Sequence, residues 1–289
     1  MSSHTEPLTK LDTISDEELV ALSNSWRETP QEEIHEMVQA CAENDSTRFN
    51  TAFNTWLAHG FDIHELEPVL QEAVVRNNVE VVSTLAENGY LGIGSVAHVA
   101  IESRSKDVLE FMLKSGWDIN NAPQTYPAVL SLAVKDEEML TWLIDHGADP
   151  NQQCAIDLTP MSIAVKEAPI STIKLLLDRG ATVNKGQLLY YAVERQSDVI
   201  EVLSILLERA AHLNARWYDD HPYSASMFFY LARGTPLHKA VTAGKYSVVQ
   251  YLLGHGADPA IKDSKGSTPL SSAVQLGRED IVALLEGAQ

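Results

Sequence analysis

One seven-residue motif occurs twice near the C-terminus of this chain, and its spacing constrains the fold more than any other feature. Thr-Pro-Leu-His-Lys-Ala-Val occupies residues 235–241, and Thr-Pro-Leu-Ser-Ser-Ala-Val follows 33 residues later, at 268–274. A period of this length is typical of solenoids, in which each short unit buries its apolar face against the next. The sequence therefore predicts a stack of small units rather than one globular core.

Each unit is predicted to contain two helices. Threonine followed by proline favours a helix start, because Thr caps the first turn and Pro lacks only an N–H that would have no helical partner there. The run Val-Val-Gln-Tyr-Leu-Leu at 248–253 has the apolar spacing of a second helix. Gly256 is placed to end that helix in the left-handed conformation, which costs glycine little. Residues 263–266 then predict a turn.

These features together resemble an ankyrin repeat. The family signature Gly-Ala-Asp-x-Asn is complete at 147–151 and partial at 180–184 and 116–120. A small alanine that lets two helices approach closely marks each unit. Eight such anchors are present: Ala40, Ala73, Ala100, Ala133, Ala164, Ala192, Ala240 and Ala273. The resemblance implies an all-α ankyrin-repeat solenoid of about eight degenerate repeats, each a helix-turn-helix followed by a hairpin finger.

The chain is expected to have three parts and one insertion. Residues 1–10 are predicted to be a disordered tail, and 11–30 an N-terminal capping helix that begins at a Ser-Asp-Glu-Glu capping box. Residues 31–289 are expected to form the repeat array. Between the sixth and seventh anchors the period lengthens to 48 residues, and the excess lies in an aromatic-rich insertion at 215–234. We expect a short helix there, over 224–233, with Gly234 as its stop.

Composition restricts the cellular compartment and the classes of partner that we expect for this chain. A formal net charge of −19 disfavours nucleic acid as a partner, because neutralising phosphates requires Lys and Arg. No apolar run approaches the ~20 residues of a membrane span, and no secretory signal is recognised at the N-terminus. Cys41 and Cys154 fit no ligand spacing and are interpreted as buried thiols of a reduced compartment. We expect a cytoplasmic or nuclear monomer with no membrane partner.

The resemblance implies a non-catalytic scaffold for protein–protein interaction. Its partner is expected in the concave groove and against the insertion, because Tyr, Trp and Phe are the residue types of binding hot spots. Trp217, Tyr218, Tyr223 and Arg233 are the predicted contact residues there. The apolar run at 228–231 is expected to pack inward and fill the gap between two unequal repeats.

A basic ladder is a second candidate for partner binding. Arg76, Lys135, Lys166 and Arg195 follow their anchor alanines at positions that face the groove in this family. They could receive an acidic segment of a partner through charge-assisted hydrogen bonds. The alternative, favoured by the acidic residues between them, is that cations simply suit the C-terminal ends of helices.

An enzyme or small-molecule binder is the runner-up hypothesis. His221, Asp219 and Asp220 are adjacent in the insertion and could form an acid–base pair, with Tyr223, Arg195 and Arg233 lining the same pocket. This hypothesis predicts a cavity of ~300 Å³ or more under the insertion. A simple turn is the favoured interpretation, because adjacent loop residues seldom point together. No metal-ligand spacing and no phosphate-binding loop are present, so no metal and no cofactor are predicted.

Overall fold

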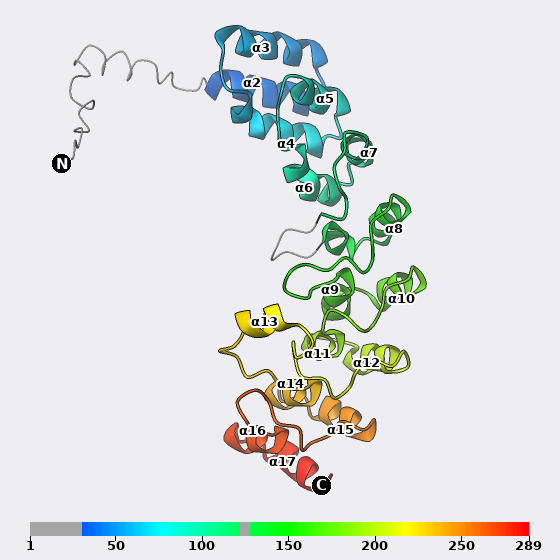
Figure 1. The fold of residues 1–289 in the computed structure, drawn as a ribbon. Helices are drawn as coiled ribbons and strands as arrows, with labels where there is room; N and C mark the ends of the chain where they lie inside the picture. Colours follow the sequence, from blue (N-terminus) through cyan, green and yellow to red (C-terminus); the bar gives the residue numbers. More distant parts are fainter. Residues whose placement is uncertain (1–30, 122–127, 289) are drawn as a thin grey trace, which may run out of the picture. The chain divides into compact units, whose positions relative to one another are not determined.

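The computed structural model describes residues 31–121 and 128–288, and all regular structure in these ranges is helical (Figure 1). The chain divides into two compact units, Met1–Gly92 and Ile93–Gln289. The all-α repeat fold predicted from the sequence is therefore confirmed for the described residues. The expected tail at 1–10 and the expected capping helix at 11–30 lie outside them.

The described part of the first unit, residues 31–92, contains two helix pairs. They are α2 (Gln31–Ala42) with α3 (Ser46–His59), and α4 (Glu67–Val75) with α5 (Val79–Glu87), with a short 3-10 helix η1 (Ile63–Leu66) before α4. Helix α2 packs against both α3 and α4. The largest fully buried side chain of this unit is Trp56, which lies beside Phe61 with ring centroids 4.8 Å apart.

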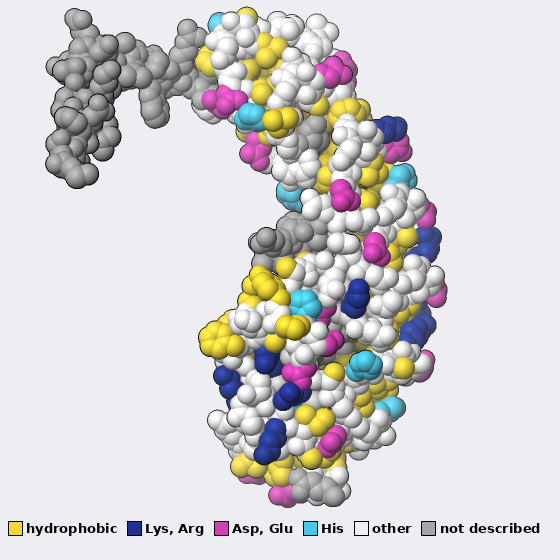
Figure 2. Space-filling model, in the orientation of Figure 1, with side chains coloured by type: hydrophobic (Ala, Val, Ile, Leu, Met, Phe, Trp, Pro, Cys, Tyr) yellow, Lys and Arg dark blue, Asp and Glu magenta, His cyan; other side chains and the backbone are white. Residues whose placement is uncertain are grey.

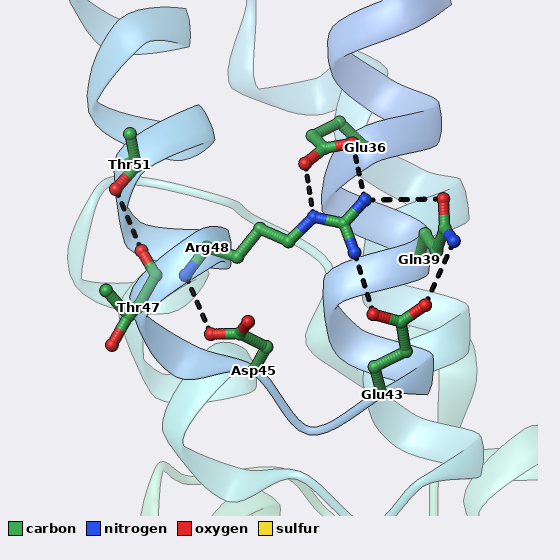
Figure 3. A network of polar contacts seen from close by, with 7 residues as sticks. All are labelled: Glu36, Gln39, Glu43, Asp45, Thr47, Arg48 and Thr51. Carbon is green, nitrogen blue, oxygen red and sulfur yellow. Dashed lines mark hydrogen bonds and ion pairs between the residues drawn. The ribbon is translucent and has the colours of Figure 1, made fainter.

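Arg48 connects the first helix pair at its surface (Figure 3). It extends from α3 to α2, where its guanidinium donates to both carboxylate oxygens of Glu36 and, at 2.7 Å, to Glu43. The hydrogen bond from Arg48 lowers the pKa of the Glu36 carboxyl from its usual value. Asp45 caps α3 by accepting from the Arg48 backbone N–H at 3.0 Å. Because solvent screens these exposed groups, the network orients the two helices more than it stabilises them.

Six helix pairs are present in the described residues of the second unit. The first helices of the pairs are α6 (Ala97–Glu102), η3 (Val129–Ala133), α9 (Pro160–Glu167), α11 (Leu188–Glu194), α14 (Pro236–Thr242) and α16 (Pro269–Gln275), with η2 (Ile93–Val96) before α6. The second helices are α7 (Lys106–Lys114), α8 (Glu137–Asp145), α10 (Ile170–Asp178), α12 (Val199–Leu207), α15 (Tyr246–Gly254) and α17 (Glu279–Glu286). Each first helix packs on the next along the unit, so they form one continuous layer.

The eight anchor alanines lie where the sequence predicted them. Every one is buried, with at most 1% of its surface exposed. A larger side chain at these positions would hold neighbouring helices apart, because protein interiors are close-packed. The anchors therefore identify the helix pairs correctly, including those with no Thr-Pro start.

The helix end predicted at Gly256 is confirmed, and six other second helices end in the same way. The second helices end at Gly60, Gly89, Gly116, Gly147, Gly180 and Gly256, all with positive φ, and Ala210 takes the same conformation at φ +61°. Alanine is disfavoured there by its Cβ, whereas glycine is not. The backbone geometry of the repeat is thus imposed even where the sequence departs from glycine.

The asparagine of the Gly-Ala-Asp-x-Asn signature connects neighbouring repeats. Asn151 donates its amide N–H to the Gly180 carbonyl and accepts from the Thr182 backbone N–H, both at 2.8 Å. Asn120 and Asn214 make the same pair of bonds to the turn of the following repeat. A side-chain amide suits this position because it has both a donor and an acceptor.

Among the described residues, no helix is long and apolar enough to cross a bilayer. The same residues contain no group of three His, Cys, Asp or Glu side chains placed to hold a metal ion.

Candidate functional site

The insertion forms a closed loop with one short helix, α13 (Pro222–Met227), drawn yellow in Figure 1. The backbone N–H of Trp217 donates to the Gly234 carbonyl at 2.9 Å, and this bond joins the two ends of the loop. The prediction of a helix over 224–233 is wrong at both ends. His221 caps the helix and Pro222 occupies its first turn, so it starts earlier, and it ends at Met227.

A stack of aromatic rings fixes the insertion to α11. Trp217 lies parallel to Tyr190, with ring centroids 4.6 Å apart, and also stacks on Tyr218, at 4.5 Å. Phe228 completes the cluster against both Trp217 and Tyr218. Such ring pairs contribute roughly 0.5–1.5 kcal/mol each beyond their buried area. The insertion is therefore a packed part of the second unit.

Tyr218 belongs to the interior of this cluster. Only 1% of its surface is exposed, and its hydroxyl lies 3.1 Å from that of Tyr191. Burial raises the pKa of Tyr191 to about 12 and that of Tyr218 even further, so both phenols stay protonated. The expectation that Tyr218 is available to a partner is wrong, and Trp217 is only half exposed.

Other large apolar side chains of the insertion do face solvent. The exposed fractions are 52% for Tyr223, 69% for Phe229 and 61% for Tyr230, and Met227 is also exposed. Figure 2 shows hydrophobic side chains, in yellow, gathered on the surface where α13 lies in Figure 1. Phe229 departs from the expectation that the run at 228–231 packs inward; Phe228 alone enters the ring stack.

The end of the insertion is joined to the hairpin finger of the next repeat by four hydrogen bonds. Ser264 donates its N–H to the Arg233 carbonyl and its hydroxyl to the Leu231 carbonyl, and it accepts from the Arg233 N–H at 2.9 Å. Lys265 donates its ammonium to the Phe229 carbonyl at 3.1 Å. We call the two joined segments, residues 217–234 and 258–267, the platform.

A pocket of about 370 Å³ lies beside the platform. It is lined by Tyr190, Ala232, Gly234, His238, Lys239, Thr242, Asp263, Lys265, Ser267, Ser272, Gln275 and Leu276. The Lys239 ammonium lies 4.7 Å from the centroid of the Tyr190 ring and 2.6 Å from a carboxylate oxygen of Glu194. Burial, the largest single influence, lowers the pKa of Lys239, but the hydrogen bonds and charges of Glu194 and Tyr190 together outweigh it and the pKa is raised. Lys239 is therefore charged and already paired.

The residues of the acid–base hypothesis do not form a catalytic group in this structure. The Nδ1 atom of His221 lies 2.9 Å from the Ser224 hydroxyl, as part of the cap of α13. Asp219 accepts from Arg216 at 2.6 Å, and Asp220 accepts from Gln187 at 3.0 Å. None of the three lines the 370 Å³ pocket; Asp220 borders a separate hollow of about 50 Å³.

The residues of the basic ladder are engaged within the protein. Arg76 pairs with Glu72 at 2.8 Å inside its own helix. Lys135 and Lys166 each pair with a carboxylate of the next repeat, Glu167 at 2.7 Å and Glu194 at 3.1 Å.

Arg195 and Arg233 bind backbone carbonyls. Arg195, with 6% of its surface exposed, donates to the Val165 and Ala168 carbonyls at the C-terminal end of α9, the latter at 2.6 Å. Arg233 donates to the Ala225 carbonyl inside the insertion. Arg195 is thus unavailable to a partner, which agrees with the alternative that cations suit helix ends.

His238 connects α14 to the finger of the last repeat. Its Nδ1 accepts from the Thr235 backbone N–H at 3.1 Å, and its Nε2 lies 3.0 Å from the Ser267 carbonyl. An N–H can only donate and a carbonyl can only accept, so the ring is neutral with its proton on Nε2. Burial lowers the pKa of His238, although the bond to Ser267 and the nearby Asp263 act in the opposite direction.

We expect His238→Ser to weaken the dependence of folding stability on acid. Because the folded pKa is lowered, the unfolded chain binds a proton first as pH falls through its ordinary value of ~6.5. The free energy of unfolding of the wild type should therefore fall between about pH 7 and 5, and that of the variant should fall less over the same range. Serine fills the same capping position at Ser162 and Ser271. Urea unfolding of both proteins across this range is the measurement; parallel pH profiles would contradict the assignment.

The stacked helix pairs, together with the asparagine hydrogen bonds that join neighbouring turns, define a helical repeat protein. The family model described as ankyrin repeats (3 copies) matches residues 130–216 and 223–289, which together make up more than half of the chain. The chain belongs to the ankyrin-repeat family.

Three similar proteins illustrate how widely this family is distributed. Putative ankyrin repeat protein FPV031 of fowlpox virus is 30% identical over 161 residues, 51% of this chain and 43% of that protein. Putative ankyrin repeat protein YahD of Escherichia coli is 28% identical over 202 residues, 66% of this chain and 94% of that protein. Human ankyrin repeat and SOCS box protein 6 is 30% identical over 176 residues, 55% and 41% respectively. The match spans less than half of the viral and human relatives.

Proposed function

We propose that this chain is a non-catalytic protein–protein interaction module whose partner contacts the platform and the adjoining surface of the first helices. Ankyrin repeats generally mediate such interactions, and fold alone does not select the partner. The observation that carries the proposal is the set of exposed aromatic side chains, Tyr223, Phe229 and Tyr230, on an insertion that a ring stack holds in place. We further propose that the protein acts as a monomer in the cytoplasm or nucleus.

Pre-organisation makes this surface suited to binding. Aromatic side chains on a fixed support lose little conformational entropy when a partner arrives, so more of the contact energy appears as affinity. The four hydrogen bonds between the insertion and the finger of the next repeat supply that support at its far end.

The test is a triple variant, Tyr223→Ser, Phe229→Ser and Tyr230→Ser, which leaves the ring stack intact. Proteins captured from a lysate of the source organism by the wild type should decrease by about tenfold or more with the variant, as expected for the loss of hot-spot side chains. Quantitative mass spectrometry of the captured proteins is the measurement.

The matched control is Tyr246→Ser, which removes an exposed aromatic side chain from α15, a second helix outside the platform. It should capture the same proteins as the wild type. Equal capture by the triple variant and the control, with unchanged thermal unfolding, would show that binding does not use the insertion.

A further inference from the structure

Many cations of the second unit are paired with carboxylates, and none of the paired ones lies on the platform. The paired cations number eight among the described residues: Arg104, Lys106, Lys114, Lys135, Lys166, Arg179, Arg216 and Lys239. On the platform, Arg233, Lys262 and Lys265 have no carboxylate partner among the described residues, a property that they share with exposed lysines elsewhere such as Lys174 and Lys185. Lys262 and Lys265 are also exposed, on the same finger.

The charge along the chain changes at the same place. Residues 210–289 contain seven Lys and Arg and seven Asp and Glu, so the whole formal charge of −19 lies in residues 1–209. Figure 2 shows dark blue side chains close to the yellow ones in the part of the surface around α13, α14 and the loop before α16. A negatively charged partner would therefore be repelled less by this region than by residues 1–209, which carry the negative charge.

Charge and apolar surface meet at Lys265. Its ammonium binds the carbonyl of Phe229, whose ring is exposed, and its side chain lines the 370 Å³ pocket. Lys262 lies three residues before it, and its own carbonyl accepts from Arg216 of the insertion at 3.4 Å. Two ammonium groups without a carboxylate partner, two exposed rings at 229–230 and a pocket therefore occupy one surface.

We propose that the platform binds an acidic protein segment that carries a large apolar side chain. Carboxylates of the segment pair with Lys262 and Lys265, and its apolar side chain packs on Phe229 and Tyr230. This inference rests on the proposed function and specifies the chemistry of the partner. A protein segment fits better than a polyanion such as nucleic acid, because Asp263 lines the same pocket, Lys239 there is already paired with Glu194, and two lysines neutralise few phosphates.

The test begins with a random peptide library displayed on phage and selected on the immobilised full-length chain. We expect the selected peptides to be enriched in Asp and Glu together with Phe, Tyr, Trp or Leu. The affinity of one selected peptide, measured by fluorescence anisotropy, should fall about five- to tenfold with Lys262→Gln/Lys265→Gln, since two exposed charge pairs are lost. It should also fall with added salt.

The matched control is Lys135→Gln/Lys166→Gln, which removes the same charge from lysines that are already paired. It should leave the peptide affinity unchanged. Equal losses with the two double variants would overturn the assignment to the platform, because they would reflect overall charge alone.

Failure of the acidic chemistry can be told apart from failure of the interaction function. Selected peptides without acidic enrichment that still lose binding in the triple aromatic variant would overturn the acidic partner and leave the proposed function standing. Selection of no peptide would count against both. Binding of phosphatidylserine vesicles or a single-stranded oligonucleotide that depends on Lys262 and Lys265, with no acidic peptide selected, would overturn the proposal in favour of that partner.

Discussion

Replacing Gly186 with alanine should lower the free energy of unfolding of the second unit by about 4 kcal/mol, through overpacking and an unfavourable φ. Gly186 has φ +79°, and a Cβ built there would lie 2.2 Å from the Ser162 hydroxyl oxygen and 2.7 Å from that of Thr159. Both serine and threonine are buried in the cap of α9 and have no space to withdraw. Urea unfolding followed by circular dichroism is the measurement.

Gly180→Ala is the matched control for this prediction. Gly180 has φ +92°, but a Cβ there would meet nothing within 4 Å, so this change should cost only ~1 kcal/mol, the penalty for φ alone. Adding Ser162→Ala to Gly186→Ala should recover part of the loss, because the two sites share one contact. Equal losses for Gly180→Ala and Gly186→Ala would show that the close approach is not what requires glycine.

Arg195→Met should lower the same free energy by about 3 kcal/mol, because it leaves buried carbonyls at the end of α9 without a donor. The guanidinium of Arg195 donates to the Val165 and Ala168 carbonyls and complements the negative end of that helix. Methionine keeps much of the buried volume, so the loss reports the polar contacts rather than a cavity.

Arg195→Lys should cost about half as much, since one ammonium can bind fewer carbonyls than the fork of arginine. Lys166→Met is the comparison on the exposed face, where the pair with Glu194 is screened and the loss should stay below ~1 kcal/mol. Stability of Arg195→Met equal to that of the wild type would mean that water reaches the carbonyls of α9.

The contact between the α9 cap and Gly186 has an equivalent in the repeat of α14, two repeats later in the chain. The Ser162 hydroxyl donates to the Gly186 carbonyl at 2.7 Å, and in the later repeat the longer His238 reaches Ser267 at the equivalent position. A short capping residue thus faces glycine, and a long one faces a residue with a Cβ. The Thr-Pro-Leu-His motif places His238 at the start of its repeat, but no local pattern indicates this pairing, because the paired positions lie 24 and 29 residues apart in the chain.

The succession of helix pairs can be predicted from the sequence, because each pair is specified by short-range backbone geometry. Buried anchors such as Ala164, helix starts such as Thr268 and helix ends such as Gly147 each impose a local conformation, and together they predict the helix pairs in order. The family follows from the same residues. The function follows only as a class, since a repeat specifies its neighbours and not its partner.

Which side chains are available for binding depends on packing between repeats, and this is seen in the tertiary structure alone. Tyr218 and Phe229 are both aromatic residues of one loop, yet the first is buried against Tyr191 and the second faces solvent. Lys166 and Lys265 are both lysines, yet only the first pairs with a carboxylate. Exposure and pairing depend on which residues of another repeat, about 30 positions away, lie opposite each side chain, and no local pattern in the sequence records that.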